Sequence, residues 1–182
     1  MSDTNEKLAK RRDIYEWIEC IVTALLACIL VFVFFVRIVD VNGNSMNPTL
    51  FNGDKMVVSK LFYTPKRGDI IVFEKASYKE EALVKRVIAT EGQTVDIDFD
   101  AGIVYVDGVA QDEPFTLEPT YNRLEFTGPQ TVPEGCIFVM GDNRNDSSDS
   151  RRATIGMVDT RMIIGKVYIN LFPFDHIGSP YK

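Results

Sequence analysis

Apolar residues are concentrated in one segment near the N-terminus. From Cys20 to Val36 the sequence contains no charged residue, whereas Met1 to Glu16 is polar and carries four Lys and Arg residues. About 20 helical residues, at about 1.5 Å each, cross a hydrocarbon core of about 30 Å. The pattern therefore predicts a single N-terminal transmembrane helix within residues 17–39. A buried core helix and a cleavable signal peptide are the alternatives. The length of the run counts against both, and no small-x-small cleavage site follows it.

Cationic residues flank this segment unequally. Four Lys and Arg residues precede it closely, and Arg37 is the only one between it and Lys55. Loops rich in Lys and Arg stay in the cytoplasm. We therefore expect a cytoplasmic tail over residues 1–16, an anchor over residues 17–39 and an extracytoplasmic domain over residues 40–182, at the plasma membrane.

Beyond the anchor, short apolar runs alternate with turn residues, which is typical of β-strands. Separators include Asn52–Asp54 and Pro133–Gly135, and the pair Asp107-Gly108 between two apolar runs is a hairpin signal. This part is therefore expected to be mostly β and antiparallel. The predicted strands are Val36–Val41, Lys55–Ser59, Asp69–Phe73, Ala82–Ala89, Thr94–Ile97, Ile103–Val106, Cys136–Met140 and Met162–Tyr168.

Composition and charge exclude some classes of function. The net charge of the 182 residues is -6, whereas a general nucleic-acid binder needs a basic face that displaces counterions. Cys20 and Cys28 fall inside the apolar segment, so Cys136 has no partner for a disulfide in the remainder. No Cys/His spacing resembles a zinc site. We expect no nucleic acid, no metal and no cofactor.

The candidate nucleophiles point to an unusual base. His176 is the only histidine and lies close to the C-terminus, which disfavours a Ser-His-Asp triad. The Gly-x-Ser-x-Gly elbow of α/β-hydrolases and a Ser-x-x-Lys motif are both absent. A serine and a lysine from distant segments remain, a known variant of triad chemistry.

Two segments supply such a pair. Ser45 follows a predicted strand in a turn-rich stretch that contains Gly43 and Pro48, and Lys85 has apolar neighbours on the strand Ala82–Ala89. Desolvation lowers the pKa of a lysine, and a neutral amine beside a serine is a general base. However, turn serines often serve only the turn and strand lysines often face solvent. The residues alone leave both interpretations open.

Several blocks of the sequence, in order after the N-terminal anchor, resemble those of bacterial type I signal peptidases. They are Ser45–Leu50, Gly53-Asp54, Arg67–Phe73, Lys85–Ala89 and Gly141–Arg151. The resemblance implies a membrane-bound serine endopeptidase that removes signal peptides from secreted preproteins through an acyl-enzyme. It also implies an antiparallel β-sheet catalytic domain, and the compact segment at about residues 91–135 is expected to form a small β cap insertion.

The resemblance assigns roles to individual residues. Ser45 is the expected nucleophile, Lys85 its general base, and the Ser45 backbone N–H an oxyanion donor. Some members carry a serine as second donor two residues before the nucleophile, where this chain has Gly43. The identity of that donor is therefore open, and a lost donor costs about 2.7–4 kcal/mol. The residues expected to orient the lysine or support it are Ser147, Asp142, Arg86, Asp149 and Arg151, although a polar surface loop is the other interpretation of residues 141–151.

Substrate and membrane contacts also follow from the resemblance. The expected partners are the lipid bilayer and signal peptides with small residues at positions -1 and -3, bound as an added strand. The segment Leu61–Tyr63 either meets the bilayer or ends a core strand. Six apolar residues are expected to line the substrate pockets, or to be core residues: Val39, Val41, Met46, Leu50, Val72 and Val84.

Two other functions are compatible with a serine–lysine pair. A self-cleaving regulator of the repressor type is soluble and usually carries a DNA-binding domain, and the predicted anchor counts against it. A catalytically inactive homologue that acts as an assembly or chaperone subunit is disfavoured because both Ser45 and Lys85 are present.

Overall fold

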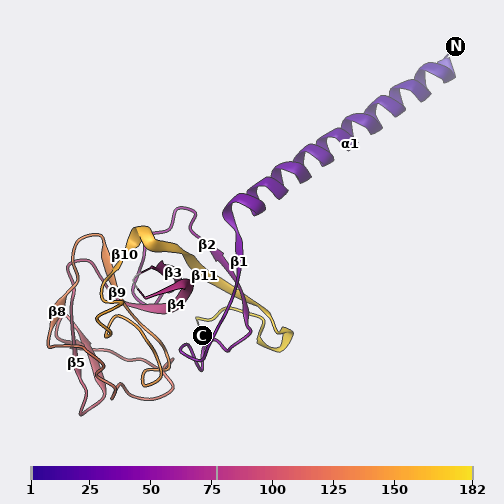
Figure 1. Cartoon of the computed structure of the whole chain (residues 1–182). Coiled ribbons are helices and arrows are strands. Elements are labelled where there is room, and N and C mark those ends of the chain that lie inside the picture. The colour runs from indigo at the N-terminus through magenta and orange to yellow at the C-terminus, as the bar shows by residue number, and fades with distance from the viewer. Residues whose placement is uncertain (1, 77, 182) are drawn as a thin grey trace. The chain divides into compact units, whose positions relative to one another are not determined.

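The computed structural model describes the backbone of residues 2–76 and 78–181, and the side chains of these residues except 2–11, 31–34, 79 and 80. The chain divides into two compact units, with the boundary between Val36 and Arg37. The first is a helix and the second is built of β-strands (Figure 1). We refer to the second as the β unit.

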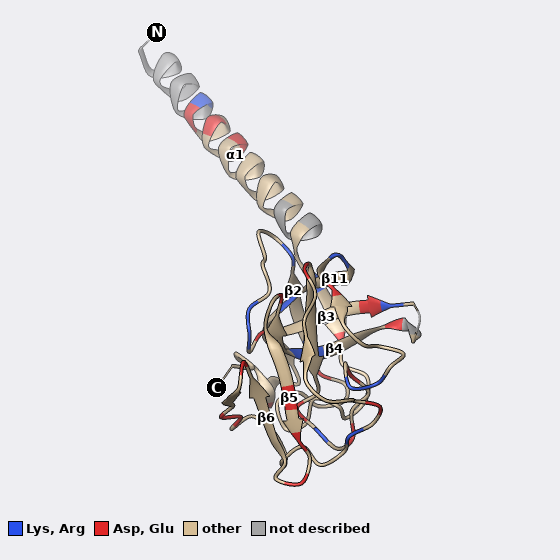
Figure 2. Cartoon of the chain, turned by 90° about the vertical axis from the view of Figure 1, so that its left-hand side faces the viewer, with Lys and Arg blue, Asp and Glu red and all other residues tan. Residues whose placement is uncertain are grey.

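Helix α1 spans Ser2–Phe35. It ends before strand β1, so the last residues of the expected 17–39 segment lie in a strand and not in a helix. Figure 2 shows the charged residues of the described part of α1 in its N-terminal half, followed by uncharged turns. Residues 31–34 of the expected anchor lie outside the described side chains. Within the described residues, no helix has an apolar stretch that meets the requirements for crossing a bilayer.

A seven-stranded antiparallel sheet forms most of the β unit, in the order β1-β2-β11-β3-β4-β9-β10. Short 3-10 helices precede and follow β11, at Thr160–Met162 and Phe174–His176. The strands are β1 (Arg37–Asp40), β2 (Lys55–Ser59), β3 (Ile70–Lys75), β4 (Lys79–Thr90), β9 (Cys136–Met140), β10 (Val158–Asp159) and β11 (Ile163–Phe172).

A second, four-stranded antiparallel sheet falls within the expected cap, in the order β7-β6-β5-β8. Asp107 and Gly108 join β6 to β7 with positive φ angles of 52° and 76°. This is the backbone that a tight hairpin requires, so the predicted hairpin is confirmed. The strands are β5 (Thr94–Asp98), β6 (Ile103–Val106), β7 (Val109–Ala110) and β8 (Gln130–Thr131).

All eight predicted runs overlap an observed strand. The two-residue strands β7, β8 and β10 were not predicted, because two residues carry no detectable alternation. Strand β4 begins at Lys79, earlier than its apolar run, because Lys79 pairs with Lys75 of β3. Strand β11 continues to Phe172, which pairs with Lys55 of β2.

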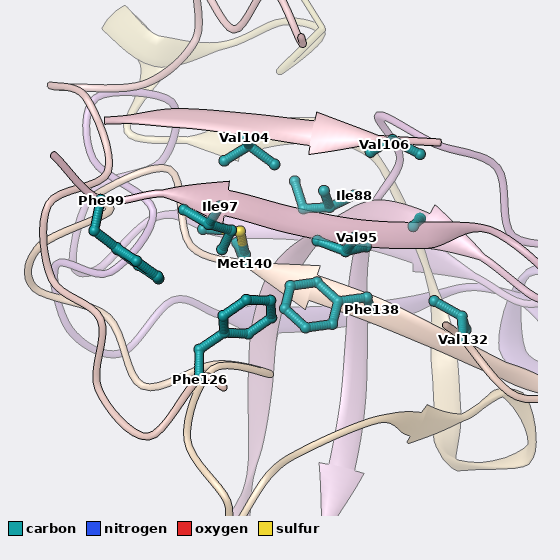
Figure 3. Packing of buried hydrophobic residues seen from close by; sticks show 11 residues of the cluster. Ile88, Val95, Ile97, Phe99, Val104, Val106, Phe126, Val132, Phe138 and Met140 are labelled. Atoms are coloured by element: carbon teal, nitrogen blue, oxygen red, sulfur yellow. The ribbon is translucent and has the colours of Figure 1, made fainter. Parts of the chain in front are cut away.

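The cap shares its core with the large sheet. Ile88 of β4 and Phe138 of β9 pack with cap residues such as Val95 and Phe126 in one buried cluster (Figure 3). Phe126 contacts Phe138 edge to face, with ring centroids 5.9 Å apart. Each sheet covers a face of the other, which explains why the strands of both sheets carry buried apolar residues. The core of the seven-stranded sheet therefore continues into the cap at β4 and β9.

Candidate active site

Ser45 and Lys85 are in direct contact. Ser45 lies in the turn that follows β1, and Lys85 lies in β4, where it pairs with Ile71 of β3. The Lys85 Nζ donates a hydrogen bond of 2.6 Å to Ser45 Oγ and one of 2.9 Å to the carbonyl of Val84. Lys85 is only 3% exposed. A buried amine next to a serine hydroxyl is the arrangement that proton abstraction requires.

The turn that carries Ser45 is held from two directions. Within the turn, the Asn47 N–H donates to the Asn44 carbonyl. From the loop after β9, the backbone N–H of Asn143 donates to the Ser45 carbonyl at 3.1 Å, and its side-chain amide donates to the Asn44 carbonyl at 3.2 Å. Sequence reasoning gave Asn143 no role, because nothing in the sequence shows that residues 44 and 143 meet.

Gly141 lies next to the Ser45 turn, Ser147 and Asp149. A Cβ at this position would overlap the Ser45 carbonyl oxygen and Ser147 Oγ, and would lie 2.7 Å from Ser147 Cβ. The Gly141 N–H donates to Asp149. Only glycine fits here without displacing the loop that carries Ser45 or Ser147.

Ser147 is 8% exposed, and its hydroxyl oxygen makes no hydrogen bond within the described residues. The hydroxyl expected to orient Lys85 therefore lies beside Gly141 and makes no hydrogen bond to the amine in the described part of the chain. Its proposed role stays a prediction.

Two ion pairs flank Ser45 and Lys85 in the protein interior. We refer to Ser45 and Lys85 together as the dyad. Arg86 donates from Nε and Nη2 to the two carboxylate oxygens of Asp142, at 2.8 and 2.6 Å. Arg151 donates to both oxygens of Asp149 at 2.9 and 2.8 Å. All four residues are at most 3% exposed. The two parallel hydrogen bonds of each pair fix the orientation of its side chains. Loss of either partner would leave an unpaired charge in the interior, so the pairs hold the loop after β9 in one arrangement.

The ionisation of Asp149 is set by its surroundings. Burial raises the pKa of this carboxyl group, but the hydrogen bond and charge of Arg151 act against it, together with the Gly141 N–H and the charge of Lys85. The pKa is lowered as a result, so Asp149 is a carboxylate at neutral pH.

One expected oxyanion donor is free and the other is engaged. The backbone N–H of Ser45 donates no hydrogen bond within the described part of the chain. In contrast, the N–H of Gly43, at a φ of 97°, donates to Asn52 Oδ1 at 2.8 Å. In this structure Gly43 therefore allows the turn its positive φ, but its N–H is not free to donate to an oxyanion.

The six residues expected to line the substrate pockets are brought together. Five of them are at most 8% exposed and belong to one apolar cluster, against which the sixth, Val39, packs. They serve as core, which was the alternative interpretation. Their contact with substrate stays a prediction. The five buried members are Val41, Met46, Leu50, Val72 and Val84.

A cavity of about 290 Å³ contains the dyad. Its walls come from the Ser45 turn, from β4 and the turn before it, from the cap and from the loop after β9. Sequence reasoning missed most of these residues, because chemical type alone does not mark a wall. The lining residues outside the dyad include Tyr78, Leu83, Asn122, Leu124, Asn145 and Arg152.

His176 does not lie with the dyad. Its ring packs on Phe51, with centroids 5.1 Å apart, and its Nδ1 is 3.5 Å from Asp54 Oδ1. It lines a separate cavity with the C-terminal residues. In this structure the base nearest to Ser45 is Lys85, and the histidine alternative has no geometric support.

Comparison with known proteins identifies a family for the chain. The sequence model of the family "Signal peptidase, peptidase S26" matches residues 14–172. A signal peptidase I of Bacillus caldolyticus is 38% identical and covers 100% of both chains, and one of Bacillus licheniformis is 36% identical over 96% of this chain and 97% of its own. A crystal structure of a signal peptidase I from Enterococcus faecalis is 33% identical over 57% of this chain and 97% of its own, with a TM-score of 0.47.

The family match covers most of the chain, and the relatives match along nearly their whole length. The chain thus belongs to peptidase S26, the signal peptidase family, and is a type I signal peptidase.

Proposed function

We propose that the chain removes signal peptides from secreted preproteins with Ser45 as nucleophile and Lys85 as general base. The observation that carries this proposal is the hydrogen bond of 2.6 Å between Lys85 Nζ and Ser45 Oγ, made by an amine that is 3% exposed. Burial disfavours the charged form of an amine. A neutral amine at this distance is able to accept the hydroxyl proton.

The reaction proceeds in two stages. Lys85 takes the Ser45 proton while Oγ attacks the carbonyl carbon of the scissile bond, and the free Ser45 N–H donates to the developing oxyanion. The carbon–nitrogen bond then breaks, and the Lys85 ammonium gives its proton to the leaving amine. Water, deprotonated by Lys85, attacks the carbonyl carbon of the acyl-enzyme. The ester bond to Ser45 Oγ breaks, the Lys85 ammonium returns its proton to Oγ, and the signal peptide leaves with a new carboxylate.

Strand β4 offers an edge to the substrate. Its first half pairs with β3, whereas β9 pairs only with Arg86–Thr90. Residues Glu81–Lys85 therefore have no strand on their other side among the described strands. An extended peptide can add to such an edge through main-chain hydrogen bonds. We propose that the residues before the cut bind there, which brings the scissile carbonyl to Ser45.

Small apolar pockets would then select the residues at positions -1 and -3. Val84 neighbours Lys85 and belongs to the same apolar cluster as Val41 and Met46. These three side chains are at most 8% exposed, and we propose that the pockets they border admit only small side chains. A preference for Ala-x-Ala follows.

We further propose that α1 anchors the enzyme in the plasma membrane, with the N-terminus in the cytoplasm. The charge-free sequence from Cys20 to Val36 supports this. Its side chains from Cys20 to Leu30 are exposed, including Leu25 and Leu26 at 59% each, and such apolar surface requires an apolar environment. Phe62, which is 99% exposed, is a second candidate for lipid contact, whereas Tyr63 is half-buried and donates to Asp69.

The substrate assignment is tested with a preprotein that carries an Ala-x-Ala site. Purified full-length enzyme in detergent is incubated with it, and mass spectrometry locates the cut. We expect cleavage after the second alanine, and loss of cleavage when either alanine is replaced by tryptophan. Cleavage elsewhere, or cleavage that tolerates tryptophan at both positions, would contradict the assignment.

A further inference from the structure

A segment of the cap without regular secondary structure lies against the catalytic loop. We call residues 111–125 the strap and residues 141–153 the catalytic loop. The strap runs between β7 and β8. Its Leu117 N–H donates to the Asp142 carbonyl at 3.2 Å, and Arg151 donates from Nη1 to the Asn122 carbonyl at 2.7 Å. The strap is therefore bonded to residues on both sides of Ser147.

Asn145 of the catalytic loop fixes the strap's course past the dyad cavity. Its Oδ1 accepts from the N–H groups of Tyr121 and Asn122, at 2.9 and 2.8 Å. Its Nδ2 donates to the Pro119 carbonyl at 3.0 Å. Asn122 and Leu124 thereby reach the wall of the cavity that holds Ser45 and Lys85.

An ion pair between a buried arginine and a partly buried glutamate also links the two segments. Arg144 of the catalytic loop is 1% exposed, and it donates from Nη1 and Nη2 to the two carboxylate oxygens of Glu113 in the strap. Its Nη1 also donates to Thr120 Oγ1 at 3.1 Å. Strap acceptors therefore fix the orientation of the guanidinium.

The same guanidinium holds the backbone next to the dyad. Arg144 Nε donates to the Gly141 carbonyl at 3.0 Å. Gly141 in turn lies so close to the Ser45 carbonyl and to Ser147 that no Cβ fits between them. Two residues further on, Asn143 donates to the Ser45 carbonyl. A shift of the Gly141 peptide would therefore displace the nucleophile's turn.

We propose that Glu113 is a positioning residue for catalysis, acting through Arg144 and Gly141 on the placement of Ser45 relative to Lys85. This inference rests on the proposed dyad function. Glu113 touches neither dyad residue among its described contacts. Its contribution is to hold the guanidinium in the one orientation that also reaches the Gly141 carbonyl.

The decisive variant is Glu113→Gln, measured in the full-length enzyme with the Ala-x-Ala preprotein. We expect kcat to fall about tenfold to 100-fold, since a misplacement of about 1 Å at the reacting atoms costs about 10²-fold. KM should stay within about twofold, because the open edge of β4 is untouched. The matched control is Glu118→Gln, which should retain wild-type kcat. Glu118 is an exposed strap acid without a hydrogen bond or ion pair among its described contacts.

Two further variants separate positioning from general destabilisation. Arg144→Lys keeps the charge but cannot bond Glu113 and Gly141 together, so its kcat should fall like that of Glu113→Gln, and the double variant should be no worse than either single one. Glu113→Asp keeps the carboxylate and should restore part of the lost kcat. Rates are measured well below each variant's Tm.

Each result has one meaning. A Glu113→Gln enzyme that is folded and keeps wild-type kcat overturns the inference, as does an effect confined to KM or additive losses in the double variant. If Glu113→Gln does not fold, Glu113→Asp decides: wild-type kcat in that variant together with wild-type kcat in Arg144→Lys overturns it. If the wild-type enzyme fails to cleave, the proposed function is at fault and not the role of Glu113.

Discussion

A single missing side chain allows the parts of this active site to meet. Gly141 lies between the carbonyl of Ser45 and the side chain of Ser147, and its N–H and carbonyl are both bonded to buried residues of the catalytic loop. A methyl group at this position cannot be accommodated by the rotation of one side chain, since one of the overlapping atoms is backbone. The position is therefore closed to every residue except glycine.

We predict that Gly141→Ala lowers kcat at least about 100-fold, because the clash must separate Ser45 from its neighbours by a distance that catalysis does not tolerate. A suitable control is Gly165→Ala, whose Cβ would meet the backbone of Ser59 at 2.7 Å, away from the dyad. The control should lower Tm but leave the rate per folded enzyme unchanged. Equal rates for the two folded variants would refute the prediction.

Asp149 makes a pH-dependent contribution to stability. Its pKa in the folded protein lies below the ordinary value of 3.8, so the contribution is complete above that value and disappears as the pH falls through the folded pKa. We predict that Asp149→Asn lowers the free energy of unfolding strongly at pH 7 and progressively less below about pH 4. Urea unfolding at several pH values measures this. The exposed Asp146→Asn is the control, and a difference independent of pH would contradict it.

At the scale of elements, strand β4 combines several tasks. It carries Lys85 toward Ser45, directs the next residue, Arg86, to the buried ion pair with Asp142, and leaves an edge open at Glu81–Lys85. Alternation along one strand explains how adjacent residues serve different partners. Further along the strand, Ile88 joins the core shared with the cap.

The shared core predicts that the cap and the seven-stranded sheet unfold together. Phe126→Ala removes a ring that is 2% exposed and packs against Phe99 and Phe138, which should cost about 3–5 kcal/mol. Amide hydrogen exchange, followed separately in the two sheets, should report one coincident unfolding transition. Phe62→Ala, at a side chain that is 99% exposed, should change stability by less than about 0.5 kcal/mol. Separate transitions for the two sheets would argue against a shared core.

The sequence predicted the elements better than their assembly. Alternation and turn residues located eight strands and the Asp107-Gly108 hairpin, since these signals are local. The contact between Ser45 and Lys85 was inferred from family blocks and not from spacing, because pairing over 40 residues is decided by the sheet order. The links from Glu113 to Arg144 and from Asn143 to the Ser45 turn left no local signal at all, since buried polar contacts depend on which loops the fold brings together.

The whole molecule consists of a helix and a β unit whose boundary lies at Val36 and Arg37. The Ser45–Lys85 pair, the two ion pairs beside it and the three apolar clusters of the described residues lie in the β unit. The chemistry and the proposed attachment to the membrane are therefore assigned to different parts of the chain.

We predict that a chain beginning at Arg37 still cleaves a short soluble peptide with an Ala-x-Ala site, at a rate within about tenfold of the full-length enzyme, but no longer sediments with membranes after carbonate extraction. The reason is that the dyad and its supports are all retained, whereas the apolar segment is removed. Retention of the shortened chain in extracted membranes would contradict the assignment of the anchor to α1.

The central claim is that Ser45 and Lys85 form the catalytic pair, and cleavage of the Ala-x-Ala preprotein by Ser45→Ala and Lys85→Ala tests it most directly. Both variants remove few contacts outside the pair, so we expect both to keep the wild-type circular dichroism spectrum and to lose activity by at least about 10³-fold. His176→Ala should retain wild-type activity. A folded Lys85→Ala enzyme that still cleaves the preprotein would show that another group takes the Ser45 proton, and the account would be wrong.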